Sequence, residues 1–405
     1  MGMSGILHIP DRTRGHRLGV SYRPIQEHAS TARVAMKHKV SVIVPCMNVE
    51  QTVDVALQSL KDQSFSDLEI LALNDGSTDQ TLAHLQAQAD RDPRIRVIDR
   101  PNSGYGATCN LGFEQATGDY LAILEPDDSV EPDFFSDLLT FADTFPKPVD
   151  AIKAAYWRLF EGENGGKPMR IPCAYYHRIH PLQQPFAITE AQEFLLHHPA
   201  IWSALYRRDW IEEKHIRFLP IPGAGWSDNP FLIETLCQTD RIAYVDKPYY
   251  RYHENSAQQA QAQLRKHPLM PMERIEDMLD VADRLKIHES KVQEALAVRA
   301  LNYAQLSVNA AGLTYPGLYD AIERCYRRLD SEIVLNSSII APGAKRRYCA
   351  IVGIEAPNIS DLSYLPHVMS ETAYRLVTDG PRFTFGALRH APNQRDSRAS
   401  KNNKQ

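Results

Sequence analysis

The 405-residue sequence has few cysteines, no excess of basic residues and no long apolar run, and each lack excludes a class of protein. Its six cysteines are scattered without a CxxC pair or a zinc-type Cys/His spacing, so we expect no disulfide scaffold and a reduced, intracellular protein. The net charge of −5 argues against a chain built to bind nucleic acid. No stretch reaches the ~18 uninterrupted apolar residues of a membrane span, and no apolar core follows the N-terminal arginines, so we expect no signal peptide.

The remaining composition is that of an ordinary globular protein. Hydrophobic residues make up 43 % and charged residues 23 %, and the length suits two or three domains. The two ends differ from the rest, because residues 1–40 hold seven Lys/Arg against two Asp/Glu and residues 386–405 hold five against one. We interpret these ends as solvated tails, with weak attraction to an anionic lipid or acceptor as the alternative.

Strand and helix patterns alternate from residue 39 onward. Apolar, β-branched segments predict strands at 39–44, 68–73, 95–98 and 120–124, with Pro45 ending the first. Apolar residues at helical spacing lie between them. This alternation predicts an α/β fold whose mostly parallel sheet is flanked by helices, and ligands of such sheets bind beyond the carboxyl ends of the strands.

Two polar clusters follow predicted strands. In the turn 74–79, Asp75 could accept a hydrogen bond from a nucleobase ring N–H and Gly76 permits a tight turn, although a capped turn before a helix explains the same pattern. The second cluster is Glu125-Pro126-Asp127-Asp128. Clustered carboxylates suit Mg²⁺ or Mn²⁺, and the alternative is an acidic turn.

Three further segments carry chemistry. The Gly-rich segment 102–112 is not a dinucleotide fingerprint, because Cys109 stands where the third glycine belongs. In the loop 222–231, Asp228 beside an aromatic residue is a candidate general base, with a structural loop as the alternative. In 249–256, polar residues could converge on a phosphate or a metal, or could lie on an aromatic edge strand.

In this order, these segments resemble family 2 glycosyltransferases of the GT-A fold, over roughly residues 39–256. Bacterial enzymes that build capsular or lipooligosaccharide glycans are the most similar. Asn74 and Glu125 stand where the family has the first Asp of its Asp-Asp and Asp-x-Asp pairs. Met47 replaces an aromatic residue that often stacks on the base, and Ser227 replaces a Glu before the catalytic Asp.

The resemblance implies a metal-dependent, inverting transfer of a sugar from a nucleoside-diphosphate sugar, with a UDP-sugar favoured. The acceptor would be a hydroxyl of a glycan or a lipid-linked molecule in cell-surface polysaccharide synthesis. Asp228 would be the catalytic base, and Mn²⁺ or Mg²⁺ would be held by Asp127, Asp128 and His253. The residues expected to bind the donor are Pro45, Met47, Asn48, Asp75, Asn102, Gly106, Asn110, Glu125, Asp127, Arg251 and Ser256.

The predicted organisation has five segments. They are a flexible segment 1–38, a nucleotide-sugar-binding half 39–140, an acceptor-binding half 141–258, a mainly helical domain 259–385 and a disordered basic tail 386–405. The helical region could hold the acceptor, pair two protomers as a homodimer or touch a membrane, or be a packed structural domain. We expect a cytoplasmic protein, with peripheral contact to the inner membrane as an open option. The competing hypothesis is a non-catalytic GT-A module that binds a nucleotide sugar or a protein partner.

Overall fold

A computed structural model describes residues 38–160, 168–221, 223, 225–254 and 257–380. Its centre is a nine-stranded sheet with the order β3-β2-β1-β4-β8-β6-β9-β5, and β7 pairs with β6 beside this path. The strands are β1 (Val40–Cys46), β2 (Leu68–Asp75), β3 (Ile95–Arg100), β4 (Tyr120–Ile123), β5 (Ser129–Val130), β6 (Ala151–Phe160), β7 (Met169–Pro172), β8 (Ala204–Arg207) and β9 (Ile242–His253).

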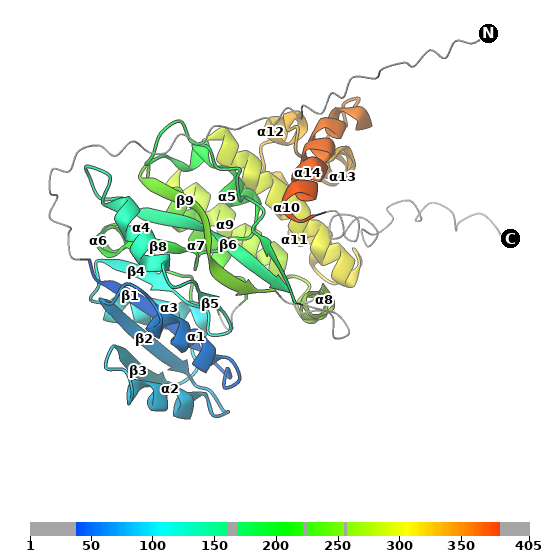
Figure 1. The fold of residues 1–405 in the computed structure, drawn as a ribbon. Coiled ribbons are helices and arrows are strands. Elements are labelled where there is room, and N and C mark those ends of the chain that lie inside the picture. Colours follow the sequence, from blue (N-terminus) through cyan, green and yellow to red (C-terminus); the bar gives the residue numbers. More distant parts are fainter. Residues whose placement is uncertain (1–37, 161–167, 222, 224, 255–256, 381–405) are drawn as a thin grey trace, which may run out of the picture. The chain divides into compact units, whose positions relative to one another are not determined.

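The first half of the sheet is parallel. Strands β1, β2, β3 and β4 pair in parallel, and in Figure 1 they lie side by side in the blue to cyan part of the ribbon. The connecting helices are α1 (Val53–Lys61), α2 (Thr81–Ala89) and α3 (Tyr105–Gln115). Strand β1 is buried along its whole length, as expected of a central parallel strand. The predicted α/β class is confirmed.

Pro45 does not end the first strand, contrary to the prediction. Strand β1 continues to Cys46, and Pro45 stands opposite Leu73 of β2. The backbone carbonyl of Ile43 accepts a hydrogen bond from the backbone N–H of Leu124. Every second residue of β1, Pro45 included, therefore directs its backbone polar groups toward β4. Because β4 pairs with β1 only as far as Ile43, the missing N–H of Pro45 costs no ladder bond.

The second half makes the sheet mixed. Strand β8 runs antiparallel to both β4 and β6, whereas β6 and β9 are parallel to each other. The short strand β5 pairs with β9 in antiparallel and brings the segment after β4 against the end of β9. The helices of this half are α4 (Phe134–Ala142), η2 (Ile188–Glu190), α5 (Glu193–Leu196), α6 (Arg208–Glu213) and α7 (Asp228–Leu236).

The chain after β9 is helical as far as it is described. Helix α9 packs against α7 and α10, and α10 also packs against α5, so this region covers the β6–β9 side of the sheet (Figure 1). Residues 340–380, which fall within the predicted mainly helical segment 259–385, are largely helical. The helices are α8 (Ala257–Lys266), α9 (Met270–Leu285), α10 (Ser290–Ala311), α11 (Leu318–Arg327), α12 (Ser331–Asn336), α13 (Pro342–Val352), η3 (Asp361–Tyr364) and α14 (Leu365–Thr378).

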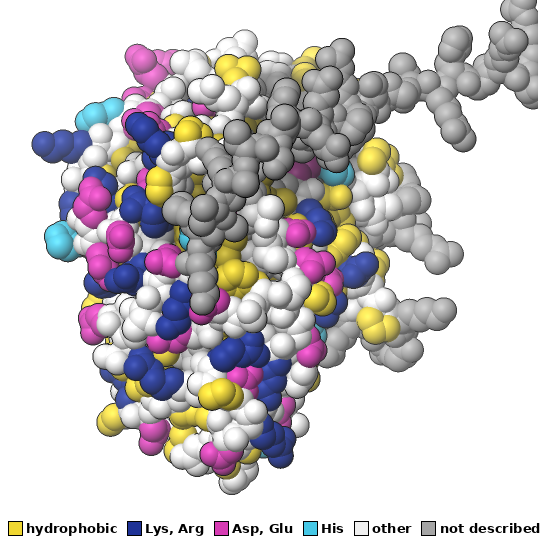
Figure 2. Space-filling view, turned by 60° about the vertical axis from the view of Figure 1, so that its left-hand side comes forward, with side chains coloured by type: hydrophobic (Ala, Val, Ile, Leu, Met, Phe, Trp, Pro, Cys, Tyr) yellow, Lys and Arg dark blue, Asp and Glu magenta, His cyan; other side chains and the backbone are white. Residues whose placement is uncertain are grey.

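Three sequence expectations concern the molecule as a whole. All six cysteines are free thiols. Within the described ranges, no helix combines the length and the apolar character needed to cross a bilayer. On the face shown in Figure 2, basic and acidic side chains are interspersed. The predicted flexible segment 1–38, apart from residue 38, and the predicted tail 386–405 lie outside the described residues, and the division into domains stays a prediction.

Candidate active site

The loops after β1, β2 and β3 interlock at the carboxyl edge of the parallel strands. The amide of Asn102 lies 3.0 Å from the sulfur of Met47. The side-chain carbonyl of Asn48 accepts a 2.8 Å bond from the backbone N–H of Thr78. Gly76 (φ 71°) is needed here, because a Cβ would lie 2.6 Å from the backbone nitrogen of Asn102. The structure therefore brings the predicted donor residues Met47, Asn48 and Asn102 together beside the end of β1.

Asp75 lies in the same place, and its carboxylate has partners within the protein. Its side chain is buried, and its carboxylate accepts bonds from the backbone N–H groups of Ser103 (2.8 Å) and Gly104 (3.0 Å) and from the Ser103 hydroxyl (3.1 Å). Both carboxylate oxygens are thus used to hold the loop after β3. Asp75 therefore supports the loop after β3, and its contact with a base stays a prediction.

Gly106 and Asn110 take part in close packing between α3 and the segment 218–219. The Asn110 amide forms two 2.9 Å bonds with the backbone N–H and C=O of Phe218. A Cβ on Gly106 would lie 2.4 Å from the carbonyl oxygen of Leu219. Helix α3 therefore packs closely against the segment 218–219, and the roles of Gly106 and Asn110 in donor binding stay predictions.

We expect Gly106→Ala to lower the free energy of unfolding by roughly 1–3 kcal/mol, because the backbone carbonyl at Leu219 must move to admit the methyl group. Urea unfolding followed by circular dichroism would measure it. Gly343→Ala in α13 is the matched control, because the nearest atom to its added Cβ is a flexible Arg347 side chain at 3.6 Å. An equal stability of Gly106→Ala and the wild type would contradict the close packing.

The carboxylate cluster after β4 divides into residues with different surroundings. Glu125 accepts a 2.5 Å bond from the hydroxyl of Tyr105. Burial raises the pKa of Glu125 to about 8, the Tyr105 bond opposes this, and the charges of Asp127 and Asp228 add to it. Asp127 is exposed, yet desolvation by the surrounding atoms raises its pKa, and His253 opposes this rise. Glu125 therefore lies in the field of two further carboxylates.

Asp128 turns inward. Its side chain is 2 % exposed, and its carboxylate accepts a 2.8 Å bond from the backbone N–H of His253. Burial raises its pKa, as does Asp127, and the Tyr250 hydroxyl opposes the shift. The pairing of β5 with β9 makes these contacts, since Ser129 stands opposite Arg251. Asp128 thus fastens the acidic turn to β9.

The predicted metal trio of Asp127, Asp128 and His253 does not form a cluster. Among the described residues, no three His, Cys, Asp or Glu side chains are placed to hold a metal ion together. A cation at this edge would have Asp127 with His253 and would need oxygen atoms from a ligand. Such a partial set is compatible with Mg²⁺-type ions, which are usually held by one or two carboxylates and by substrate phosphates.

Arg251, in the predicted phosphate-binding segment, is paired with a carboxylate of the protein. Arg251 forms a two-pronged ion pair with Glu131, at 3.0 and 2.6 Å, so its guanidinium is engaged within the protein. The sequence does not reveal this partner, which β5 brings beside Arg251, and the role of Arg251 in donor binding stays a prediction. Ser256 lies outside the described residues.

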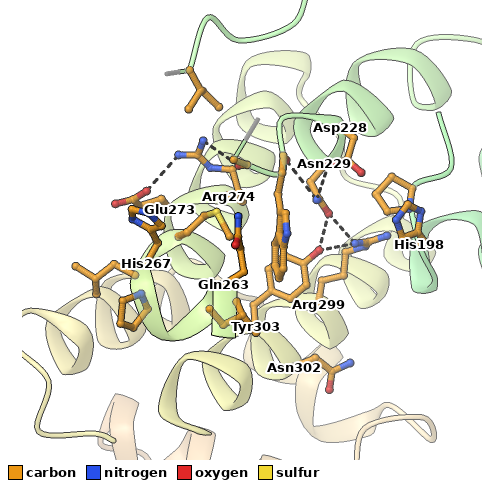
Figure 3. Close-up of a pocket in the computed structure, with 18 of the residues that line it drawn as sticks. His198, Asp228, Asn229, Gln263, His267, Glu273, Arg274, Arg299, Asn302 and Tyr303 are labelled. Atoms are coloured by element: carbon orange, nitrogen blue, oxygen red, sulfur yellow. Dashed lines mark hydrogen bonds and ion pairs between the residues drawn. The ribbon is translucent and has the colours of Figure 1, made fainter. Parts of the chain in front are cut away.

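Asp228 begins helix α7 at the rim of a cavity of about 1280 Å³ (Figure 3). Burial raises the pKa of Asp228 to about 6, while the positive charge of Arg299 and the Asn229 side chain oppose the shift. The preceding Trp226 also lines the cavity and has a left-handed backbone (φ 58°). A carboxyl with a pKa near neutrality at the wall of a cavity is suited to accepting a proton.

The sequence analysis missed four residues around these carboxyls: Tyr105, Asn229, Arg299 and Tyr303. Tyr105 holds Glu125, and the other three form a hydrogen-bonded group behind Asp228. One signal was present for Arg299. It follows Ala295 by four residues on the apolar side of a helical pattern, where a buried arginine requires partners.

A parallel sheet edge with carboxylates, joined to a mixed half that carries another carboxyl above a cavity, is the GT-A type of fold. A structure of residues 1–349 of S. aureus TarS in complex with UDP shares it, with a TM-score of 0.58, 18 % identity and coverage of 85 % of this chain and 92 % of that chain. Residues 41–213 match the family model described as Glycosyl transferase family 2.

The curated relatives of this chain include proteins named glycosyltransferases. A glycosyltransferase of Escherichia coli K12 named YibD, itself uncharacterized, is 29 % identical over 53 % of this chain and 61 % of its own length. A Bacillus subtilis glycosyltransferase named EpsH is 31 % identical over 53 % of this chain and 60 % of its own length. The chain thus matches about three fifths of these relatives, and Asp228 and the helical region lie beyond the family match.

Proposed function

We propose that the protein is a glycosyltransferase that moves a sugar from a nucleoside-diphosphate sugar, with a UDP-sugar favoured, to a hydroxyl of a glycan or lipid-linked acceptor. The observation that carries the proposal is the position of Asp228. It interacts electrostatically with Glu125 at the donor edge and also lines the large cavity. A proton acceptor between a donor edge and an acceptor-sized cavity is what a single displacement needs.

In the proposed reaction, the acceptor hydroxyl gives its proton to the Asp228 carboxylate while its oxygen attacks the anomeric carbon. The bond from that carbon to the phosphate oxygen breaks, and its electron pair leaves with the diphosphate. Attack from the face opposite the leaving group inverts the anomeric centre. Asp127 and His253 would hold Mn²⁺ or Mg²⁺, which supplies charge neutralisation for the leaving diphosphate.

The cavity suits a saccharide acceptor. Its wall carries the aromatic side chains of Trp226, Tyr252, Tyr303 and Tyr315. Aromatic faces pack against the apolar faces of sugar rings, and polar groups between them bond the hydroxyls. Charged side chains of both signs, Glu254 and Glu273 with Lys266 and Arg274, also line it. We therefore place the acceptor between Trp226 and the helices after β9; peripheral membrane contact and a homodimer through these helices stay predictions.

A thermal-shift panel tests the proposal, with UDP, GDP, CDP and TDP each in Mn²⁺ and in EDTA. A nucleotide that binds only the folded protein stabilises it by about 2.7 kcal/mol at a hundred times its Kd. We expect one nucleotide to raise the melting temperature, and only with Mn²⁺. No shift with any nucleotide would contradict a nucleotide-sugar transferase. Binding without release of the diphosphate from the matching sugar donor would favour the non-catalytic module.

A further inference from the structure

Helix α10, outside the family-matching segment, reaches the centre of the proposed site. Arg299 of this helix is 4 % exposed. Its guanidinium donates to the side-chain carbonyl of Asn229 at 2.9 Å and to the Tyr303 hydroxyl at 2.8 Å. The Tyr303 hydroxyl donates to the same Asn229 oxygen at 2.5 Å, and Figure 3 shows the three side chains converging.

These two donors fix the orientation of the Asn229 amide. Because its oxygen receives bonds from Arg299 and Tyr303, its NH₂ group must point the other way. That NH₂ donates to the carboxylate of Asp228 at 3.1 Å and to the carbonyl of Trp226 at 3.3 Å. The chain of bonds therefore runs from α10 through one amide to the proposed base.

The far side of Arg299 is fixed as well. Its guanidinium also donates to the carbonyl of Leu195, at 2.5 Å, and to that of His197. Leu195 and His197 belong to the segment that leads to His198, and His197 and His198 line the cavity. Arg299 thus donates to four acceptors of the protein while it also lines the cavity, and its positioning role is exerted through the residues that it holds.

We propose that Arg299, Tyr303 and Asn229 are positioning residues that hold the Asp228 carboxylate in its proton-accepting orientation, which makes α10 part of the active centre. The inference rests on the proposed function, because it assumes that Asp228 is the base. It explains why a helical region follows the GT-A core in the chain. A displacement of about 1 Å at a reacting group can cost about a hundredfold in rate.

The electrostatics of Asp228 give this role a measurable signature. The ionisable groups that interact with it are Arg299 and Tyr303 of α10, Glu125 after β4, Tyr105 of α3 and Tyr252 of β9. Arg299 is the cation among them, and it opposes the rise in the pKa of Asp228. Loss of this charge must therefore move the acid limb of the pH–rate profile to higher pH.

The experiment measures release of diphosphate from the nucleotide sugar that the panel selects, with Mn²⁺ and with water as the acceptor. We expect Arg299→Gln to lower kcat about 10–100-fold with donor KM unchanged, and to shift the acid limb to higher pH. Arg299→Lys restores the position of the acid limb because it restores the charge. Tyr303→Phe removes only one hydroxyl, so it keeps the test valid if Arg299→Gln fails to fold. We expect it to lower kcat without moving the acid limb.

The control is Arg328→Gln, since Arg328 pairs with Asp280 and Asp283 on the surface. It should leave kcat and the pH profile unchanged. Asp228→Asn is measured in parallel. If Asp228→Asn is inactive while Arg299→Gln and Tyr303→Phe keep the wild-type kcat and pH profile, the positioning role is overturned and the proposed function stands. If Asp228→Asn keeps wild-type activity, Asp228 is not the base and the positioning role falls with it, whereas the transferase activity itself stands.

Discussion

Asp228→Asn is expected to abolish sugar transfer and to leave nucleotide binding intact. An amide cannot accept the acceptor proton, and general-base catalysis contributes roughly 10²–10⁴-fold. The isosteric side chain keeps the contact with Asn229 and fills the same volume, while the donor edge around Met47 and Asn102 is untouched. Diphosphate release and the Mn²⁺-dependent thermal shift, measured on the same preparation, would separate the two effects.

The pH dependence follows from the raised pKa of Asp228. The base must be ionised, so wild-type activity should rise as the pH increases through about 6. The contribution of Asp228 to the free energy of unfolding falls over the same rise in pH. The folded state binds this proton more tightly than the unfolded state, so the contribution of Asp228 is largest at low pH and is lost as the pH rises from about 4 to about 6.

Two controls complete this prediction. At pH 7.5, Asp228→Asn should melt no lower than the wild type, because it removes an ionised group from a partly buried site. Asp90→Asn, which neutralises an exposed carboxylate at the end of α2, should leave activity unchanged. A melting temperature well below the wild type for Asp228→Asn would mean that its inactivity reports unfolding, and transfer near the wild-type rate would remove Asp228 from the role of base.

The parallel half of the fold was predictable because its signals are local. Each strand from β1 to β4 is a short apolar run followed by a turn and a helical pattern. The second half was not, since β8 inserts between β4 and β6 through contacts of residues far apart in the chain. Pro45 illustrates the limit: whether a proline ends a strand depends on where the neighbouring strand stops.

The candidate site was predictable by residue type but not by orientation. Asp75 and Asp128 stand in the segments that the sequence singled out, yet their carboxylates are bonded to backbone N–H groups of Ser103, Gly104 and His253. Sequence patterns cannot tell a carboxylate that faces a ligand from one that supports a loop, because both need the same group beside a turn. Arg299 was missed since its partner, Asn229, lies 70 positions away.

Asp127 and Asp128, adjacent in sequence, are expected to give opposite phenotypes. Asp127 is exposed and close to His253, so Asp127→Ala should remove the Mn²⁺-dependent part of nucleotide binding and leave the melting temperature unchanged. Asp128→Ala removes the charged acceptor of the part-buried hydrogen bond from the His253 N–H, which costs roughly 1–3 kcal/mol of stability. Titration with UDP in Mn²⁺ and in EDTA, together with urea unfolding, would measure both.

The comparison decides between two arrangements of the acidic turn. If Asp128 were a metal ligand, its loss would abolish the Mn²⁺ dependence even where the protein remains folded. In the wild-type structure the carboxylate of Asp128 faces Tyr250 and β9, while Asp127 is exposed. We therefore expect folded Asp128→Ala to keep the Mn²⁺ dependence. Loss of the Mn²⁺ effect in folded Asp128→Ala, with Asp127→Ala normal, would show that the turn reverses its two carboxylates when a donor binds. The exposed carboxylate is therefore the one through which donor binding should depend on the metal.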